Sequence, residues 1–362
     1  MSEVLYDVMN GGEFFAAANS AGGFVSFYDR VFAREGIEKR YLIKGGPGTG
    51  KSSFMRKVAE RATEEGLAVE YYRCSSDPDS LDGIIVEGRV ALLDATAPHE
   101  FSPTLAGAVD ETVDLGSFWR SSGLEGERDE IKRLSLEKGA CYAQAYDILG
   151  AVGGLERACR RLVAPLIDHQ KLDRMAESIL KRLPSGKGGE LKVALRDSVG
   201  MKGRVRLDGY ERLAHRTVNV NDVCGVGDML LERVLKGALS KGLSVRVSYD
   251  PVMPSRVDAL LIEDTATAFV IGTPSLEGAR AVNMRRAVIT GGEESGRIRR
   301  EYKRLKRLSS QLVGSAVSCL EHAGTAHFAL ERIYVRHMDF DAESRFCRSF
   351  AESVINRLIS EK

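Results

Sequence analysis

The sequence has no excess of charge of either sign and no long apolar run. Its 52 lysine and arginine residues nearly balance 51 aspartate and glutamate residues, which leaves a formal net charge of +1. This balance gives no global attraction to nucleic acid or to a membrane surface. No apolar run is long enough to span a bilayer. The first residues form neither a basic segment nor an apolar one, so we expect no signal peptide.

Paired cysteines are also missing. The six cysteines are scattered along the chain without a Cys-x-x-Cys pair, which argues against a zinc site and against a disulfide framework. Together with the expected lack of a signal peptide, this predicts a protein of the reduced cytoplasm. The chain has 362 residues, of which 43% are hydrophobic, enough for one large core or two ordinary ones.

What the chain does contain is a glycine-rich loop between an apolar strand and a helix. A β-prone run at residues 40–44 leads into Gly45-x-x-x-x-Gly50-Lys51-Ser52, which is the Walker A pattern. The glycines allow backbone conformations that a side chain would block. The freed N–H groups can then form a nest for phosphate oxygens. A helix over residues 51–65 is predicted to follow, and its N-terminal dipole favours the same anion.

The polar residues of this loop have predicted roles. Lys51 is expected to reach the β and γ phosphates of a nucleoside triphosphate, and the Ser52 hydroxyl is expected to bind Mg²⁺. An accidental glycine-rich turn is the alternative, but the flanking strand and helix are the context that a genuine site requires. The predicted nucleotide-binding residues are Gly45, Gly46, Pro47, Gly48, Thr49, Gly50, Lys51, Ser52 and Ser53.

Two further strands are predicted in the first half. One covers residues 68–73, and the other, Val90–Asp94, is an apolar run that ends in a carboxylate. The second has the form of a Walker B strand, whose aspartate holds Mg²⁺, so Asp94 is the other predicted metal ligand. Ala95 stands where the additional-strand ATPases commonly place a water-activating glutamate. This absence favours a kinase-like or switch-like geometry.

The loop Cys74–Asp82 is rich in aspartate. Ligands in open α/β sheets bind beyond the carboxyl ends of strands, so we expect this loop to lie near the phosphates. Asp77 and Asp79 are candidates for orienting a water molecule or binding an acceptor hydroxyl. Turn chemistry is the alternative, since Asp-Pro-Asp-Ser is a favourable turn. Asp82 and Glu87 recur in the second half of the chain, so we predict that they are structural.

The second half of the sequence repeats the first. Pro78 matches Pro254 and Pro98 matches Pro274, and 254 − 78 and 274 − 98 both equal 176. Chance similarity between two α/β units is the alternative, but a constant offset argues against it. The longer matching segments are Gly66–Val69 with Gly242–Val245 and Asp82–Glu87 with Asp258–Glu263.

The repeat predicts that the second phosphate loop is degenerate. Residues 221–231 keep a short glycine turn and the start of a helix, but they have lost the lysine and the hydroxyl. An acid in this place would repel phosphate, so we expect no triphosphate to bind there. The aligned pairs are Gly50 with Val226, Lys51 with Gly227, Ser52 with Asp228 and Asp94 with Val270.

The helical segments set the predicted domain boundaries. Residues 125–180 have long apolar and charged periodicity with few breakers and are expected to be mostly helical. Residues 183–190 form a plausible linker. We therefore predict a nucleotide-binding domain over residues 1–183 and a degenerate repeat over residues 190–362. Near the N-terminus, the apolar residues between positions 24 and 31 have helical spacing.

Several motifs together resemble a group of poorly characterised bacterial ATPases that carry tandem P-loop domains in one chain. The resemblance covers the first half well and the second half weakly. It implies ATP binding at Gly45–Ser53, while the loss of the second loop departs from members with two intact sites. The motifs that carry it are Phe14–Phe24, Lys44–Ser52, Cys74–Asp82 and Leu93–His99.

The remaining candidates are basic and aromatic. Residues 297–307 form the one strong basic run, and a solvated helix face is its simplest interpretation. The run is otherwise a surface for nucleic acid or an acidic protein, or a source of an arginine for the intact site. Arg120 is a second arginine candidate, and Trp119 is expected as a core anchor. His99 is either a phosphate contact or a surface histidine.

The sequence therefore predicts a duplicated P-loop NTPase of the α/β class, with three α/β/α layers and mostly parallel sheets. Its expected function is binding of ATP with Mg²⁺ and slow hydrolysis that couples nucleotide state to a partner. A P-loop small-molecule kinase and a non-catalytic nucleotide sensor are the alternatives. The predicted catalytic residues are Lys51, Asp77, Asp79 and Asp94.

Overall fold

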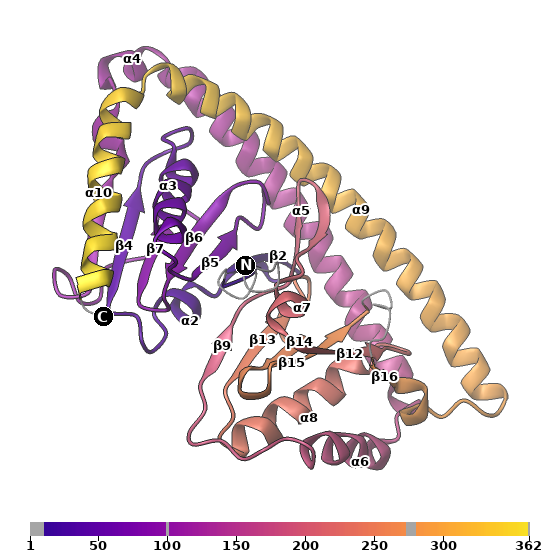
Figure 1. Ribbon diagram of the computed structural model, residues 1–362. Coiled ribbons are helices and arrows are strands. Elements are labelled where there is room, and N and C mark those ends of the chain that lie inside the picture. Colours follow the sequence, from indigo (N-terminus) through magenta and orange to yellow (C-terminus); the bar gives the residue numbers. More distant parts are fainter. Residues whose placement is uncertain (1–10, 99–100, 273–279, 361–362) are drawn as a thin grey trace.

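The chain folds into two α/β halves that are joined by a pair of long helices (Figure 1). The computed structural model describes residues 11–98, 101–272 and 280–360. The first half holds a six-stranded sheet in the order β1-β5-β6-β7-β4-β8. Its strands are β1 (Glu13–Phe15), β4 (Lys39–Lys44), β5 (Val69–Arg73), β6 (Leu81–Val86), β7 (Val90–Asp94) and β8 (Asp110–Asp114).

The three strands predicted in this half are confirmed to within one residue. Strand β6, which the sequence analysis missed, lies between β5 and β7 and runs antiparallel to both. The other described neighbours in this sheet pair in parallel, so the expectation of a mostly parallel sheet is confirmed. Glu87 and Gly88, with φ of 52° and 69°, form the tight turn that returns β6 into β7.

Helix α3 (Lys51–Glu64) begins and ends as predicted, and Gly66 follows it with a φ of 72°. It covers one face of the sheet together with α10 (Phe340–Ser360). The opposite face packs on α2 (Tyr28–Phe32), which has five residues, and on the second half of the chain. The expected third layer is therefore only a short helix, because the junction between the halves takes its place.

The second half repeats this architecture. Its sheet has the order β9-β13-β14-β15-β12-β16, and β14 is again the antiparallel strand. The 176-residue offset carries α3 onto α8 (Gly227–Ser240) and β5 onto β13, so the predicted internal repeat is confirmed. The strands are β9 (Leu191–Val193), β12 (Arg216–Asn221), β13 (Val245–Tyr249), β14 (Val257–Ile262), β15 (Thr267–Ile271) and β16 (Arg280–Asn283).

The two halves exchange their terminal helices. Helix α5 (Arg128–Val163) leaves the first half and leads into α6 (His169–Leu180), which packs on α8 of the second half. Helix α9 (Glu293–Arg336) returns from the second half and leads into α10, which packs on α3 of the first. The compact units thus differ from the stretches 1–183 and 190–362, since each unit borrows a helix from the other.

Helices α5 and α9 run antiparallel along both halves (Figure 1). At 1.5 Å per residue, the 44 residues of α9 span about 66 Å. Buried residues of both helices, among them Leu149, Val152 and Leu320, form a core of their own. The prediction that residues 125–180 are mostly helical is confirmed, with α4 (Ser121–Gly126) preceding α5. Among the described residues, no helix combines the length and apolar character that crossing a membrane requires.

Two small hairpins meet where the halves join. They consist of β2 (Ala17–Ser20) with β3 (Gly23–Ser26), and of β10 (Asp197–Gly200) with β11 (Gly203–Arg206). The helix predicted over residues 24–31 is wrong in its first part, because Gly22 and Gly23 return the chain as β3 before α2 begins. The predicted linker, residues 183–190, contains neither helix nor strand.

Candidate functional site

The glycine-rich loop connects β4 to α3 at the carboxyl end of the first sheet. Gly45, Gly48 and Gly50 have φ of 152°, 68° and 80°, conformations that L-residues rarely adopt. Thr49 stabilises the turn by donating its hydroxyl to the carbonyl of Gly46 at 3.0 Å. The backbone therefore has the left-handed glycine conformations that were expected of an anion-binding nest.

Lys51 and Asp94 meet beside this loop. The Lys51 Nζ donates to the carbonyls of Gly45 and Gly46 at 2.8 and 3.0 Å, and it lies 3.5 Å from the Asp94 Oδ2. Strands β4 and β7 are direct neighbours, so no additional strand separates the two residues. The Thr96 hydroxyl donates to the Gly45 carbonyl at 2.9 Å. The structure thus brings together the two residues that the sequence paired as Walker A lysine and Walker B aspartate.

The two predicted metal ligands fit a magnesium ion by their chemistry. Ser52 follows Lys51 directly and supplies a hydroxyl oxygen, and Asp94 supplies a carboxylate; Mg²⁺ prefers such oxygen ligands and keeps several waters. The Ser52 Oγ accepts a hydrogen bond from the Leu81 N–H at 3.0 Å. The residues that the structure describes contain no group of three or more histidine, cysteine or acidic ligands. An ion here would therefore share its coordination with phosphate oxygens and water.

The aspartate-rich loop lies next to α3, as predicted, but its acids make other contacts. Asp77 accepts from the Asp79 N–H at 3.3 Å and from the Ser80 hydroxyl at 3.0 Å, which is turn chemistry. The Asp79 carboxylate pairs with Lys202 of the second half. This bonding favours the turn interpretation that the sequence left open, and it gives the predicted catalytic roles of both residues no support.

The two acids predicted to be structural are placed accordingly. Asp82 is buried, and after the effect of burial its charge helps to raise the pKa of Tyr28. The Glu87 carboxylate accepts from the Ala68 N–H at 2.6 Å, which ties the β6–β7 turn to the start of β5. His99 lies outside the described residues.

Helix α9 covers the loop, which the sequence analysis missed. A β-carbon added at Gly48 would lie 2.8 Å from the Glu331 carbonyl oxygen and 3.0 Å from a Val335 methyl group. One added at Gly46 would lie 3.1 Å from the Trp119 ring and 3.6 Å from the Tyr334 ring. The glycines therefore allow close approach as well as turning. No local pattern could have indicated this contact, because more than 280 residues separate its two sides.

Helix α5 contributes a lysine to the same region. Burial and the charge of Lys51 lower the pKa of Lys138, which places this second ammonium group within electrostatic range of the loop. Two cations that face each other in this way favour an anion nearby. Trp119, expected as a core anchor, is half-buried between the loop and Tyr334, with 5.3 Å between the ring centroids.

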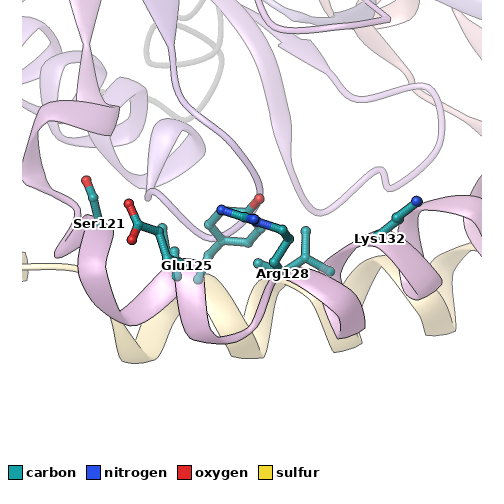
Figure 2. Close-up of a pocket in the computed structure, with 7 residues that line it drawn as sticks. Ser121, Glu125, Arg128 and Lys132 are labelled. Atoms are coloured by element: carbon teal, nitrogen blue, oxygen red, sulfur yellow. The ribbon is translucent and has the colours of Figure 1, made fainter.

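A cavity of about 390 Å³ adjoins the covered loop. Figure 2 shows its labelled side chains, Ser121, Glu125, Arg128 and Lys132, projecting from one side of α4 and α5. Tyr334 lines the cavity and also approaches Gly46, so it connects the two places. The cavity is completed by Leu124 and Ile131.

The degenerate loop fills its own nest. The Asp222 Oδ1 accepts from the N–H groups of Val226 and Gly227, both at 2.8 Å. Asp222 aligns with Gly46 at the 176-residue offset, so a carboxylate stands where the first loop has no side chain. Asp228 pairs with Arg160 of α5. The prediction that this half binds no triphosphate thereby gains a physical reason, since a bound acid already uses the N–H groups.

The basic run lies at the wrong end of α9 to serve the intact site. Tyr302, inside the run, approaches Gly225 of the degenerate loop, whereas the intact loop contacts Glu331. The 29 residues between Tyr302 and Glu331 extend about 44 Å along a helix, beyond the reach of any arginine side chain. The hypothesis that residues 297–307 donate an arginine to the first loop is therefore wrong. Arg120 is exposed beside the loop's neighbour Trp119.

No family model, curated protein or solved structure was found to match this chain.

Proposed function

We propose that the chain binds ATP with Mg²⁺ at Gly45–Ser53 and hydrolyses it slowly. The observation that carries this proposal is the backbone of the loop, where three glycines with positive φ lead directly into a helix headed by Lys51. The combination supplies N–H groups, a helix N-terminus and a cation at one point, which suits a polyphosphate. The placement of Asp94 at 3.5 Å from Lys51 supports the same conclusion.

Within this proposal, each residue has a separate task. The loop N–H groups hold the phosphate oxygens, and the Lys51 ammonium leaves the carbonyls of Gly45 and Gly46 for the β and γ phosphates. Ser52 and Asp94 hold Mg²⁺, which when bound neutralises charge on the phosphate oxygens. The contact between Gly48 and α9 then gives nucleotide a means of moving a helix that begins in the other half.

That helix offers a route to a partner. The basic run of α9 lies far from the intact loop, and its Arg297, Arg300 and Lys303 side chains are exposed. A shift of α9 upon nucleotide binding changes the presentation of this face. An anionic partner, either an acidic protein surface or nucleic acid, is the kind that such a face attracts.

A small-molecule kinase is the second candidate, and the cavity beside the loop favours it. Arg128 and Lys132 make the lining basic, which suits an anionic acceptor held near the terminal phosphate. The predicted acceptor residues Asp77 and Asp79 are not part of this cavity's lining, so the acceptor site moves to α4 and α5.

The experiment follows γ-labelled ATP incubated with the purified chain, with and without metabolite extract. Release of label into water supports the ATPase, and transfer to an acceptor supports the kinase. Tight binding without turnover supports a sensor. The variant Lys51→Ala should weaken nucleotide binding by roughly 10- to 100-fold, since it removes hydrogen bonds to a charged ligand.

The matched control is Asp228→Ala in the degenerate loop, which should change neither binding nor turnover. Asp228 pairs with Arg160, so thermal unfolding of this variant should be recorded alongside. Equal losses of binding in both variants would contradict the one-site proposal.

A further inference from the structure

The last turns of α9 place one carboxylate over the phosphate loop. The Cα of Glu331 lies 3.4 Å from the position of a β-carbon at Gly48, and its carbonyl oxygen lies 2.8 Å from it. Val335, one turn further along, packs against the same glycine. The helix is thus seated on the loop itself, and Glu331 is the acidic residue at the point of contact.

The surroundings of Glu331 keep its carboxylate charged. The side-chain hydrogen bond with His327, whose Nε2 lies 3.5 Å from the Glu331 Oε1, is the main cause of a lowered pKa. The Gly48 N–H and the charge of Lys51 lower this pKa further, against the opposing effect of burial. The carboxylate therefore lies within reach of the loop N–H groups and in the field of the phosphate-binding lysine.

The internal repeat shows which residue occupies the same place in the other half. Paired bridges, Trp119 with Met338 and Ile167 with Val288, make Ile167 the counterpart of Met338. The same 171-residue separation carries Arg160 onto Glu331. Arg160 pairs with Asp228 at the head of α8, so this point of each helix contacts the loop region of one half. An arginine faces the acidic, degenerate loop, and an acid faces the loop that keeps its lysine.

We propose that Glu331 is the catalytic carboxylate that orients and deprotonates the attacking water. This inference rests on the proposed function. It also answers an absence, because Ala95 stands where the additional-strand ATPases place such an acid. The water oxygen forms a bond to the γ-phosphorus, and the bond from that phosphorus to the bridging oxygen breaks. The leaving diphosphate takes the electron pair, and the Glu331 carboxylate takes the proton of the water.

The placement of Glu331 links chemistry to the second half. The helix that carries it begins at Glu293, beside the degenerate unit. A displacement of that unit along α9 would withdraw the carboxylate from the loop without changing any residue of the nucleotide site. Hydrolysis is then controlled by the position of a helix instead of by the phosphate loop alone.

The test separates nucleotide binding from turnover. Trp119 is the only tryptophan in the chain and contacts Gly46 and Tyr334, so its fluorescence reports binding of ATP with Mg²⁺. Glu331→Gln, which keeps the shape of the side chain, should bind within about threefold of the wild type. Its phosphate release should fall by about 10²-fold or more, the usual contribution of a general base.

The control on the same helix is Glu321→Gln, an exposed position two to three turns earlier, which should leave both readouts unchanged. Glu331→Asp keeps the charge but withdraws it by one methylene, and it should retain an intermediate rate. Thermal unfolding checks that all three variants are folded.

Three outcomes would overturn the inference. Unchanged phosphate release in Glu331→Gln would show that the acid is not needed, and tighter binding with faster release would show that it only obstructs the loop. A wild-type chain that binds ATP but releases no phosphate would also exclude it while leaving nucleotide binding intact. A fluorescence signal that ATP does not change would instead contradict the proposed function itself.

Discussion

Gly48 is the residue at which the demands on the phosphate loop are greatest. Its φ of 68° places it in the left-handed region, where a residue with a β-carbon is strained. The same missing side chain leaves room for the backbone of Glu331 and for Val335. Gly88 provides a comparison, because its φ is 69° and a β-carbon there would meet nothing within 4 Å. The two glycines share one backbone requirement and differ in the second.

A pair of alanine variants separates these effects. Gly88→Ala should cost about 1–2 kcal/mol from backbone strain alone. Gly48→Ala should cost a further 1–3 kcal/mol or so, since overpacking forces α9 away from the loop. Chemical denaturation gives both values, and Trp119 fluorescence should change only in the Gly48 variant. Equal costs in the two variants would mean that α9 does not rest on the loop.

At the scale of elements, the exchanged helices decide how the cores are completed. The core that supports α3 is closed by residues of α10, among them Cys347, Val354 and Ile355. These residues come from the far end of the chain, so the unit with the intact loop cannot form its core from the first 183 residues alone. Helix α6 completes the other unit in the same way through Leu172 and Ala176.

Two isoleucines on α10 test the contribution of this exchange. Ile355 is fully buried against the first unit, whereas Ile359, one turn later, is 43% exposed. Ile355→Ala should lower the free energy of unfolding by about 2–5 kcal/mol through loss of contacts and a residual cavity. Ile359→Ala should change it by roughly 0.5 kcal/mol or less. Urea denaturation of both variants gives the comparison, and similar values would contradict the packing of α10 on α3.

At the scale of the whole molecule, charged side chains join the two halves across the repeat. The carboxylate of Glu70 receives hydrogen bonds from Arg34 and from Arg246, each at 3.0 Å. Arg246 occupies the position of the second half that corresponds to Glu70 at the 176-residue offset. Burial alone would raise the pKa of Glu70, but Arg246 and Arg34 outweigh it and hold this pKa well below its ordinary value.

The lowered pKa predicts a pH dependence. A carboxylate with a depressed pKa in the folded state stabilises the protein above its unfolded pKa of about 4.3, and the contribution is lost as pH falls towards the folded pKa. Glu70→Gln, which strands two buried guanidinium groups, should cost about 3–5 kcal/mol at pH 7. The difference from the wild type should shrink below about pH 4.3.

Urea denaturation at pH 7 and at pH 3 measures this difference directly. The exposed Glu60 on α3 supplies the control variant Glu60→Gln, which should match the wild type at both values. A gap between Glu70→Gln and the wild type that stayed constant over this range would show that Glu70 is not the titrating link between the halves.

Local pattern alone determined the strands β4, β5 and β7, the start of α3, the glycine loop and the repeat, because each depends on residues close in sequence. Strand β6 was missed, although Ile84, Ile85 and the turn at Gly88 indicate it. Tertiary structure decided the exchange of helices, the carboxylate of Glu331 over Gly48 and the carboxylate of Asp222 inside the second nest. The first two depend on contacts between distant parts of the chain, and Asp222 depends on the direction in which a loop turns its side chain. Neither kind of information leaves a periodic signal in the sequence.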